Sequence, residues 1–133
     1  MLKRKIDKYL EEWKASADKK PLIVKGARQV GKTASIRYFG EKYYKYIVEI
    51  NFALQPKYKQ IFADGYEVDS IIKNITLLNP SLVVVPHETL LFFDELQEYP
   101  DCATSLKSFK QDGRYDVICS GSLMGLYYQQ IES

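Results

Sequence analysis

The sequence is poor in the residues that build metal centres and disulfide frameworks. Its 133 residues include two cysteines, Cys102 and Cys119, and a single histidine, His87. The cysteines form no CxxC pair and the histidine has no second nitrogen ligand beside it, which argues against a zinc site. Two cysteines give no support to a disulfide framework either, and this usage suits a reducing compartment. We therefore expect a cytoplasmic protein.

Long apolar runs and a dominant charge are also lacking. No run approaches the ~18 residues needed to span a bilayer, and the basic start at residues 1–8 leads into an amphipathic stretch rather than the apolar core of a secretory signal. Nineteen Lys and Arg stand against 17 Asp and Glu, for a net charge of +2. No membrane partner is expected. A nucleic-acid partner stays open, through residues 3–5 or 57–59, but the charge balance does not support it.

What the chain does have is the composition of one ordinary globular domain. Hydrophobic residues make up 46% and charged residues 27%, which excludes disorder for the chain as a whole. Apolar periodicity predicts helices over residues 2–13, 32–42, 68–78 and 101–110, a helix-biased stretch over 56–62, and strands at 22–24, 46–51, 90–93 and 117–120. Because helices separate the strands, we expect an α/β fold with a parallel sheet and helices on both faces.

The sequence also indicates three local details of this layout. Residues 82–85 fit either a strand or a segment that packs at a helix end. Asp101 is placed to cap the helix over 101–110, which Asp112 and Gly113 would end. Residues 123–131 look like the start of one more helix.

The most informative motif is the run GARQVGKT at residues 26–33, which fits G-x-x-x-x-G-K-[ST] at every required position. Glycines let the backbone wrap so that its N–H groups meet a polyphosphate, and the following helix dipole adds to the attraction. Lys32 is expected to reach the β- and γ-phosphates, and the Thr33 hydroxyl to ligate Mg²⁺. The predicted nucleotide-binding residues are Gly26, Ala27, Arg28, Gln29, Val30, Gly31, Lys32, Thr33 and Ala34. The plain alternative is a chance glycine-rich turn before a helix.

A second element is the apolar strand of residues 90–95, LLFFDE, which ends in two carboxylates. Ligands of open α/β sheets sit at the carboxyl ends of the strands. Asp94 is therefore expected to face the Mg²⁺ that Thr33 holds, and Glu95 to polarise a water for attack on the γ-phosphate. The alternative is a strand that simply ends in a solvated acidic turn.

The third element is the strand of residues 117–122, VICSGS, which ends in hydroxyls and a glycine. If this strand lies between the other two, Ser120 or Ser122 touches the γ-phosphate or the attacking water. We predict Ser120 as a catalytic residue together with Lys32 and Glu95. An ordinary exit from strand to turn is the alternative.

Taken together, the three elements resemble the AAA+ class of P-loop ATPases, as Walker A, Walker B with its catalytic glutamate, and sensor 1. The runs GARQVGKT, FFDELQ and SGSL are similar to a bacterial and archaeal family of AAA+-like ATPases that carry a C-terminal domain of uncharacterised function. The resemblance covers Arg4 to about Gly125. It implies the strand order 5-1-4-3-2, in which the strand ending at Ser120 separates the Walker A and Walker B strands. It also implies that the helix around residues 6–10 borders the adenine.

The resemblance further implies parts that these 133 residues do not supply. The class has a fifth strand and a helical lid with a second sensor arginine, and the family adds its C-terminal domain. We therefore expect the N-terminal part of a longer protein, with residues 1–20 as a leading helix and residues 21–133 as a partial αβα core that has four of five strands. The lid and extra domain would be partners of this core. A neighbouring subunit usually supplies the completing arginine, and Arg37 and Arg114 are candidates.

Three functions remain open at this stage. The first is binding and hydrolysis of ATP with Mg²⁺, which drives a conformational change in a larger protein. The second is a nucleotide-dependent binding or switch module with little turnover. The third is a P-loop kinase acting on a small molecule, which Glu95 disfavours because a kinase excludes water. A GTPase is disfavoured because no Asn-Lys-x-Asp motif occurs. For this chain alone we expect weak hydrolysis or none.

A sheet that lacks its fifth strand would expose an apolar edge at residues 22–24, and such an edge invites pairing with another copy. We predict self-association or strand swapping of this chain. Light scattering at high protein concentration measures it, and a strictly monomeric species would contradict the prediction.

Overall fold

A computed structural model describes residues 5–17, 19–26 and 30–122 of the chain. Its helices and strands are, in chain order, α1 (Lys5–Ala15), β1 (Leu22–Gly26), α2 (Val30–Tyr43), β2 (Tyr46–Asn51), the 3₁₀ helix η1 (Pro56–Phe62), α3 (Val68–Leu78), β3 (Thr89–Asp94), the 3₁₀ helix η2 (Leu96–Glu98), α4 (Asp101–Asp112) and β4 (Asp116–Ser122). Every helix and strand expected within these ranges is present, with the stretch over 56–62 formed as a 3₁₀ helix.

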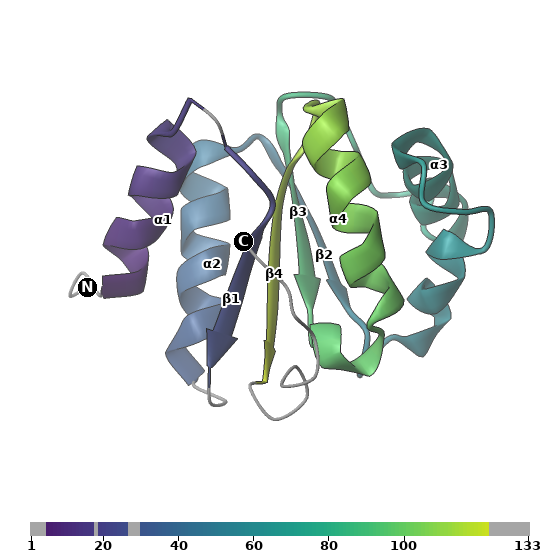
Figure 1. Cartoon of the computed structure of the whole chain (residues 1–133), viewed down its shortest axis with the longest axis horizontal. Coiled ribbons are helices and arrows are strands. Elements are labelled where there is room, and N and C mark those ends of the chain that lie inside the picture. The colour runs from purple at the N-terminus through teal and green to yellow at the C-terminus, as the bar shows by residue number, and fades with distance from the viewer. Residues whose placement is uncertain (1–4, 18, 27–29, 123–133) are drawn as a thin grey trace.

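The strands form one parallel sheet in the order β1-β4-β3-β2. This confirms the expected α/β class and the order 1-4-3-2 among the strands present. The register pairs Val24 with Ser120 and Asn51 with Asp94. All the arrowheads in Figure 1 point to the same end of the molecule, so the strands bring their carboxyl ends together at one edge.

Helices cover both faces of this sheet, α1 and α2 on one face and α3 and α4 on the other (Figure 1). Alternate side chains of strand β3 pack against the helices on opposite faces of the sheet. Leu90 and Phe92 pack in the cluster that contains residues of α1 and α2, whereas Leu91 and Phe93 pack in the cluster that contains residues of α3 and α4. The whole strand is buried, which explains why it is a continuous apolar run rather than an alternating one.

Helix α2 lies close against the sheet at Gly40. A Cβ at this position would lie 2.7 Å from Ile47 Cδ1 and 3.1 Å from Leu90 Cδ2. Glycine therefore allows a close approach between α2 and the neighbouring strands, β2 and β3. This contact fixes the helix whose first turn carries Lys32.

Two local expectations need comment. Residues 82–85 belong to neither a strand nor a helix, and the Val85 N–H donates to the Thr89 Oγ1 at 2.9 Å. The expectation that Asp101 caps α4 is wrong, because Pro100 already has helical angles (φ −57°, ψ −23°) and Asp101 is the first helical residue. Its charge still favours the positive end of the helix dipole. The helix expected over 123–131 lies outside the described residues.

Strand β1 lies at an edge of the described sheet, where β4 is its neighbour. This is the edge that the predicted self-association would use. In the described ranges, no helix is both long and apolar enough to cross a membrane.

Candidate nucleotide-binding site

Asp94 and Ser120 lie at the carboxyl edge of the sheet, on the face that α2 covers. Side chains two positions apart on a strand share a face. Phe92 and Ile118 pack in the cluster of α1 and α2, so Asp94 and Ser120, two positions further on, project towards the same side. The start of α2 and the two polar strand ends thus converge.

A hydrogen bond joins these two strand ends. The Ser120 Oγ donates to Asp94 Oδ1 at 2.5 Å, and the Glu95 N–H donates to the same oxygen at 2.8 Å. Asp94 is 8% exposed and Ser120 is fully buried. Two donors on Oδ1 fix the orientation of the carboxylate, and none of the described residues gives a hydrogen bond to Oδ2. This second oxygen is available to a cation or to a water.

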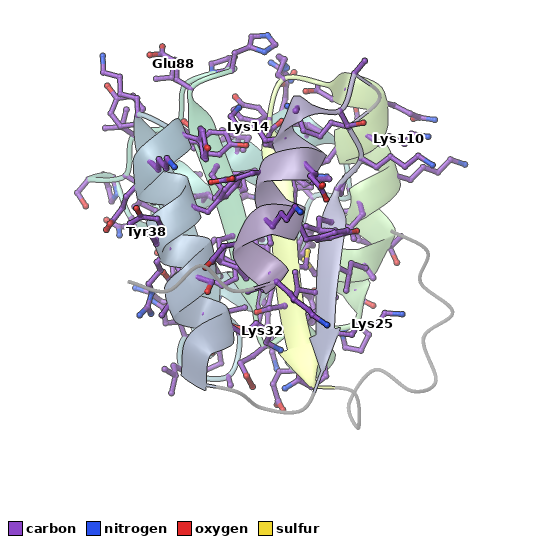
Figure 2. The ribbon with its side chains drawn as sticks, turned by 90° about the vertical axis from the view of Figure 1, so that its left-hand side faces the viewer. Lys14, Lys25, Lys32, Tyr38, Glu88 and Lys110 are labelled. Atoms are coloured by element: carbon purple, nitrogen blue, oxygen red, sulfur yellow. The ribbon has the colours of Figure 1, made fainter. Side chains whose placement is uncertain are left out.

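Lys32 lies beside this pair, in the first turn of α2 and towards the lower end of the molecule in Figure 2. Its Nζ donates to the Gly121 carbonyl oxygen of β4 at 3.2 Å. Burial lowers the pKa of Lys32, while the charges of Asp94 and Glu95 act in the opposite direction. A partly desolvated ammonium therefore faces two carboxylates, and this arrangement suits a group that receives an anion.

The lowered pKa of Lys32 predicts a pH dependence of stability. Between the lowered pKa and the ordinary value of 10.5, the unfolded chain binds more protons at this site than the folded chain. Raising the pH through this window should therefore stabilise the wild type relative to Lys32→Ala. Urea unfolding of both proteins at neutral pH and at about pH 10 measures the difference, and an unchanged or reversed difference would contradict the prediction.

The loop predicted to hold the phosphates begins and ends at this same edge. Gly26 ends β1 and pairs with Ser122 of β4, and Val30 opens α2. Within the first turn of α2, Gly31 and Thr33 are half-buried and Ala34 is exposed. Ala27, Arg28 and Gln29 lie outside the described residues. The predicted phosphate-binding loop therefore connects the end of strand β1 to the start of helix α2.

A family model for an AAA domain matches residues 18–133. The chain belongs to this family of AAA domains. The match supports a nucleotide-binding core of the ATPase type. A search of curated proteins finds no match.

Glu95 of this AAA domain has an unusual backbone conformation. Its φ of 58° and ψ of 48° are left-handed, which costs a residue with a Cβ about 1–2 kcal/mol. The Gln97 Nε2 donates to Glu95 Oε2 at 2.8 Å. Gln97 therefore contacts the predicted water-polarising group, a role that the sequence analysis did not assign. In the sequence, Gln97 is the last residue of the run FFDELQ, which carries part of the resemblance to the AAA+-like family.

We predict that Glu95→Gly stabilises the AAA domain by about 1 kcal/mol, because glycine relieves the left-handed strain at no steric cost. The loss of the Gln97 contact subtracts from this gain. Urea denaturation measures the free energy of unfolding. Glu98→Gly is the matched control and should destabilise, since Glu98 ends η2 and is not among the described residues with a positive φ. A loss of stability in Glu95→Gly comparable to that of the control would contradict the prediction.

The two arginines proposed as partners for a neighbouring site form ion pairs within the chain. Arg37 donates to both carboxylate oxygens of Glu49, at 2.8 and 2.6 Å. Arg114 pairs with Asp112 at 2.8 Å and with Asp69 at 2.6 Å. Either arginine would have to exchange these partners before it reached another subunit. On α1, the helix predicted to border the adenine, Leu10 is fully buried in the core and Tyr9 is 52% exposed.

The residues present fit a magnesium ion that arrives with a nucleotide. Mg²⁺ keeps several waters and takes one or two carboxylates together with phosphate oxygens. Asp94 Oδ2 and the Thr33 hydroxyl are hard oxygen ligands of the required kind. The described part of the chain contains no group of three or more His, Cys, Asp or Glu that could hold a metal unaided. The donor set is therefore that of a shared site, completed by the ligand.

Proposed function

We propose that this AAA domain binds ATP with Mg²⁺ at the carboxyl edge of its sheet and hydrolyses it, driving a conformational change in the protein that contains it. One observation carries the proposal: buried Asp94, bonded to Ser120 across β3 and β4, stands next to the partly desolvated Lys32. A purely structural cluster would not need a lysine facing two acids at the mouth of a glycine-rich loop.

Each residue has a distinct task in this proposal. Lys32 exchanges the Gly121 carbonyl for phosphate oxygens and offsets their charge. Asp94 and Thr33 would hold Mg²⁺, which supplies Lewis-acid neutralisation of the phosphates. Glu95 orients the attacking water and accepts its proton, with its carboxylate steadied by Gln97. The Ser120 hydroxyl donates its hydrogen bond to Asp94, so Ser120 acts through that carboxylate as a positioning residue.

A switch with little turnover is the second candidate, and the arginine pairs favour it. Arg37 and Arg114, the proposed finger residues, are both bound to carboxylates of their own chain. Without an arginine at the transferring phosphate, hydrolysis in related nucleotide sites is slower by about 10³–10⁵. Binding would then exceed turnover in this chain.

Calorimetry with ATP tests the proposal. We expect heat of binding with ATP in the presence of Mg²⁺, weaker binding when a chelator removes the metal, and none with AMP, because the loop recognises the β- and γ-phosphates. A phosphate-release assay on the same samples separates the two candidates, since a switch binds without release. No binding of ATP at about 1 mM, the upper end of the usual range, would overturn the proposal.

A further inference from the structure

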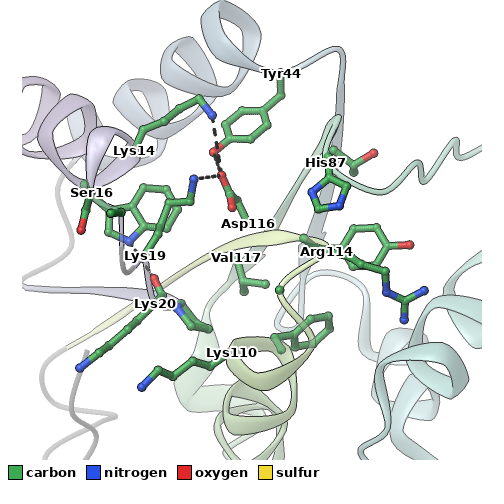
Figure 3. Close-up of a pocket in the computed structure, with 17 residues that line it drawn as sticks. Lys14, Ser16, Lys19, Lys20, Tyr44, His87, Lys110, Arg114, Asp116 and Val117 are labelled. Carbon is green, nitrogen blue, oxygen red and sulfur yellow. Dashed lines mark hydrogen bonds and ion pairs between the residues drawn. The ribbon is translucent and has the colours of Figure 1, made fainter.

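A pocket lies at the opposite edge of the sheet from the candidate nucleotide site. Its cavity of about 340 Å³ opens where β3 and β4 begin, beside the carboxyl ends of α1 and α4 (Figure 3). That volume is at the lower end of the range for small-molecule sites. The strands run away from this pocket towards the nucleotide site, so the two sites share no residue.

The pocket is strongly basic. Among the described residues, those that line it with a positive charge are Lys14, Lys19, Lys20, Lys110 and Arg114, and the acidic one is Asp116. The described lining therefore carries five positive charges and one negative charge, or +4, whereas the whole chain carries +2.

Asp116 cannot balance the lysines around it. The Tyr44 hydroxyl donates to Asp116 Oδ2, and the ammonium groups of Lys19 and Lys14 lie 3.1 and 3.8 Å from the same oxygen. A single carboxylate thus pairs with two ammonium groups and accepts a hydrogen bond from a phenol (Figure 3). Arg114 is different, because Asp112 and Asp69 already neutralise it.

Lys20 and Lys110 form no ion pair with any described carboxylate, and Figure 3 shows their side chains on the same side of the pocket. Lys110 is in the last turn of α4, where a cation complements the helix dipole. Lys20 precedes β1 and lies on no helix, so the dipole does not account for it. Two cations that line one pocket and have no described acid as a partner are stabilised by an anion bound between them.

We propose that this pocket binds a small phosphate-bearing ligand, held chiefly by Lys20 and Lys110. Lysines on flexible stems recognise charge rather than a planar shape, which favours a compact group with two or more negative charges. The cavity is too small for a nucleic-acid duplex. The backbone of Lys20 is anchored, because the Trp13 Nε1–H donates to the Lys20 carbonyl oxygen at 2.7 Å.

Trp13 makes the test specific to this pocket, because it lines the cavity and is the only tryptophan of the chain. Pyrophosphate is the probe, titrated at constant ionic strength with sodium chloride as the comparison. We expect a saturable change in tryptophan fluorescence and in the indole N–H resonance. The double variant Lys20→Gln/Lys110→Gln should weaken the apparent affinity about tenfold or more. The control double variant Lys57→Gln/Lys73→Gln removes the same charge from η1 and α3 and should change it less than about twofold.

Three results with pyrophosphate would overturn the inference. They are no saturable change, an equal loss of affinity in both double variants, or loss of the signal in Lys32→Ala, which would assign it to the nucleotide site. A fluorescence change that persists in Lys32→Ala comes from the new pocket, so this test remains valid even if the proposed ATPase activity is absent. A 5′-phosphorylated oligonucleotide and its unphosphorylated form distinguish the source of the phosphate. Equal binding of the two at this pocket would assign it to a nucleic-acid backbone and overturn the small-ligand proposal.

Discussion

Replacing Lys32 with alanine should weaken binding of ATP with Mg²⁺ by about 100-fold or more while the fold remains intact. The ammonium is the cation that the described site offers to the phosphates, and each charge-assisted hydrogen bond contributes about 1.5–3 kcal/mol. In the absence of nucleotide, its described hydrogen bond goes to the Gly121 carbonyl. Losing that single bond costs far less than losing the contacts to a triphosphate. Calorimetry gives the binding constant, and far-ultraviolet circular dichroism reports the fold.

Lys73→Ala is the matched control, because Lys73 is an exposed lysine on α3 and the substitution removes the same charge. Its affinity for ATP should stay within about twofold of the wild type, since an exposed charge far from the ligand is screened by salt. If both variants bind ATP as the wild type does, residues 26–33 do not form the phosphate site and the proposed function fails.

The fold could be predicted from the sequence because its signals are local. The apolar run of residues 90–93 and the glycine pattern of residues 26–33 mark a buried strand and a strand-to-helix turn without reference to the rest of the chain. The order of the strands was not local information, since it came from a resemblance to AAA+ ATPases. The parallel pairing β1-β4-β3-β2 confirms that order for the four strands described.

The parts of the site that could not be predicted depend on contacts between distant segments or on backbone angles. The hydrogen bond between Ser120 and Asp94 requires β4 to lie next to β3. The residues alone did not predict this pairing, and the role of Ser120 was stated on the assumption that it exists. The left-handed angles of Glu95 and the contact from Gln97 follow from the turn into η2. The basic pocket draws Lys20 and Lys110 from segments 90 residues apart in the sequence, so no local pattern marks it.

Replacing Glu95 with glutamine should reduce phosphate release by about 100-fold or more in any form of the protein that hydrolyses ATP. The amide keeps the shape of the side chain and still accepts the hydrogen bond from Gln97, but it cannot take a proton from water. Binding of ATP should stay within about threefold of the wild type, because the substitution removes a group needed in the transition state rather than a ground-state contact. Phosphate release and calorimetry on the same preparation measure the two effects.

Glu98→Gln is the control, since Glu98 is an exposed acid three residues further along and lies in η2. It should leave both ATP binding and phosphate release unchanged. A loss of phosphate release in Glu95→Gln alone then shows that the effect depends on position 95 and not on the removal of a negative charge. The comparison also separates the candidate functions. A switch with little turnover shows binding in both variants and no release in either, whereas an ATPase loses release in Glu95→Gln alone. Equal phosphate release by the wild type and Glu95→Gln would assign the water to another group and contradict the role proposed for Glu95.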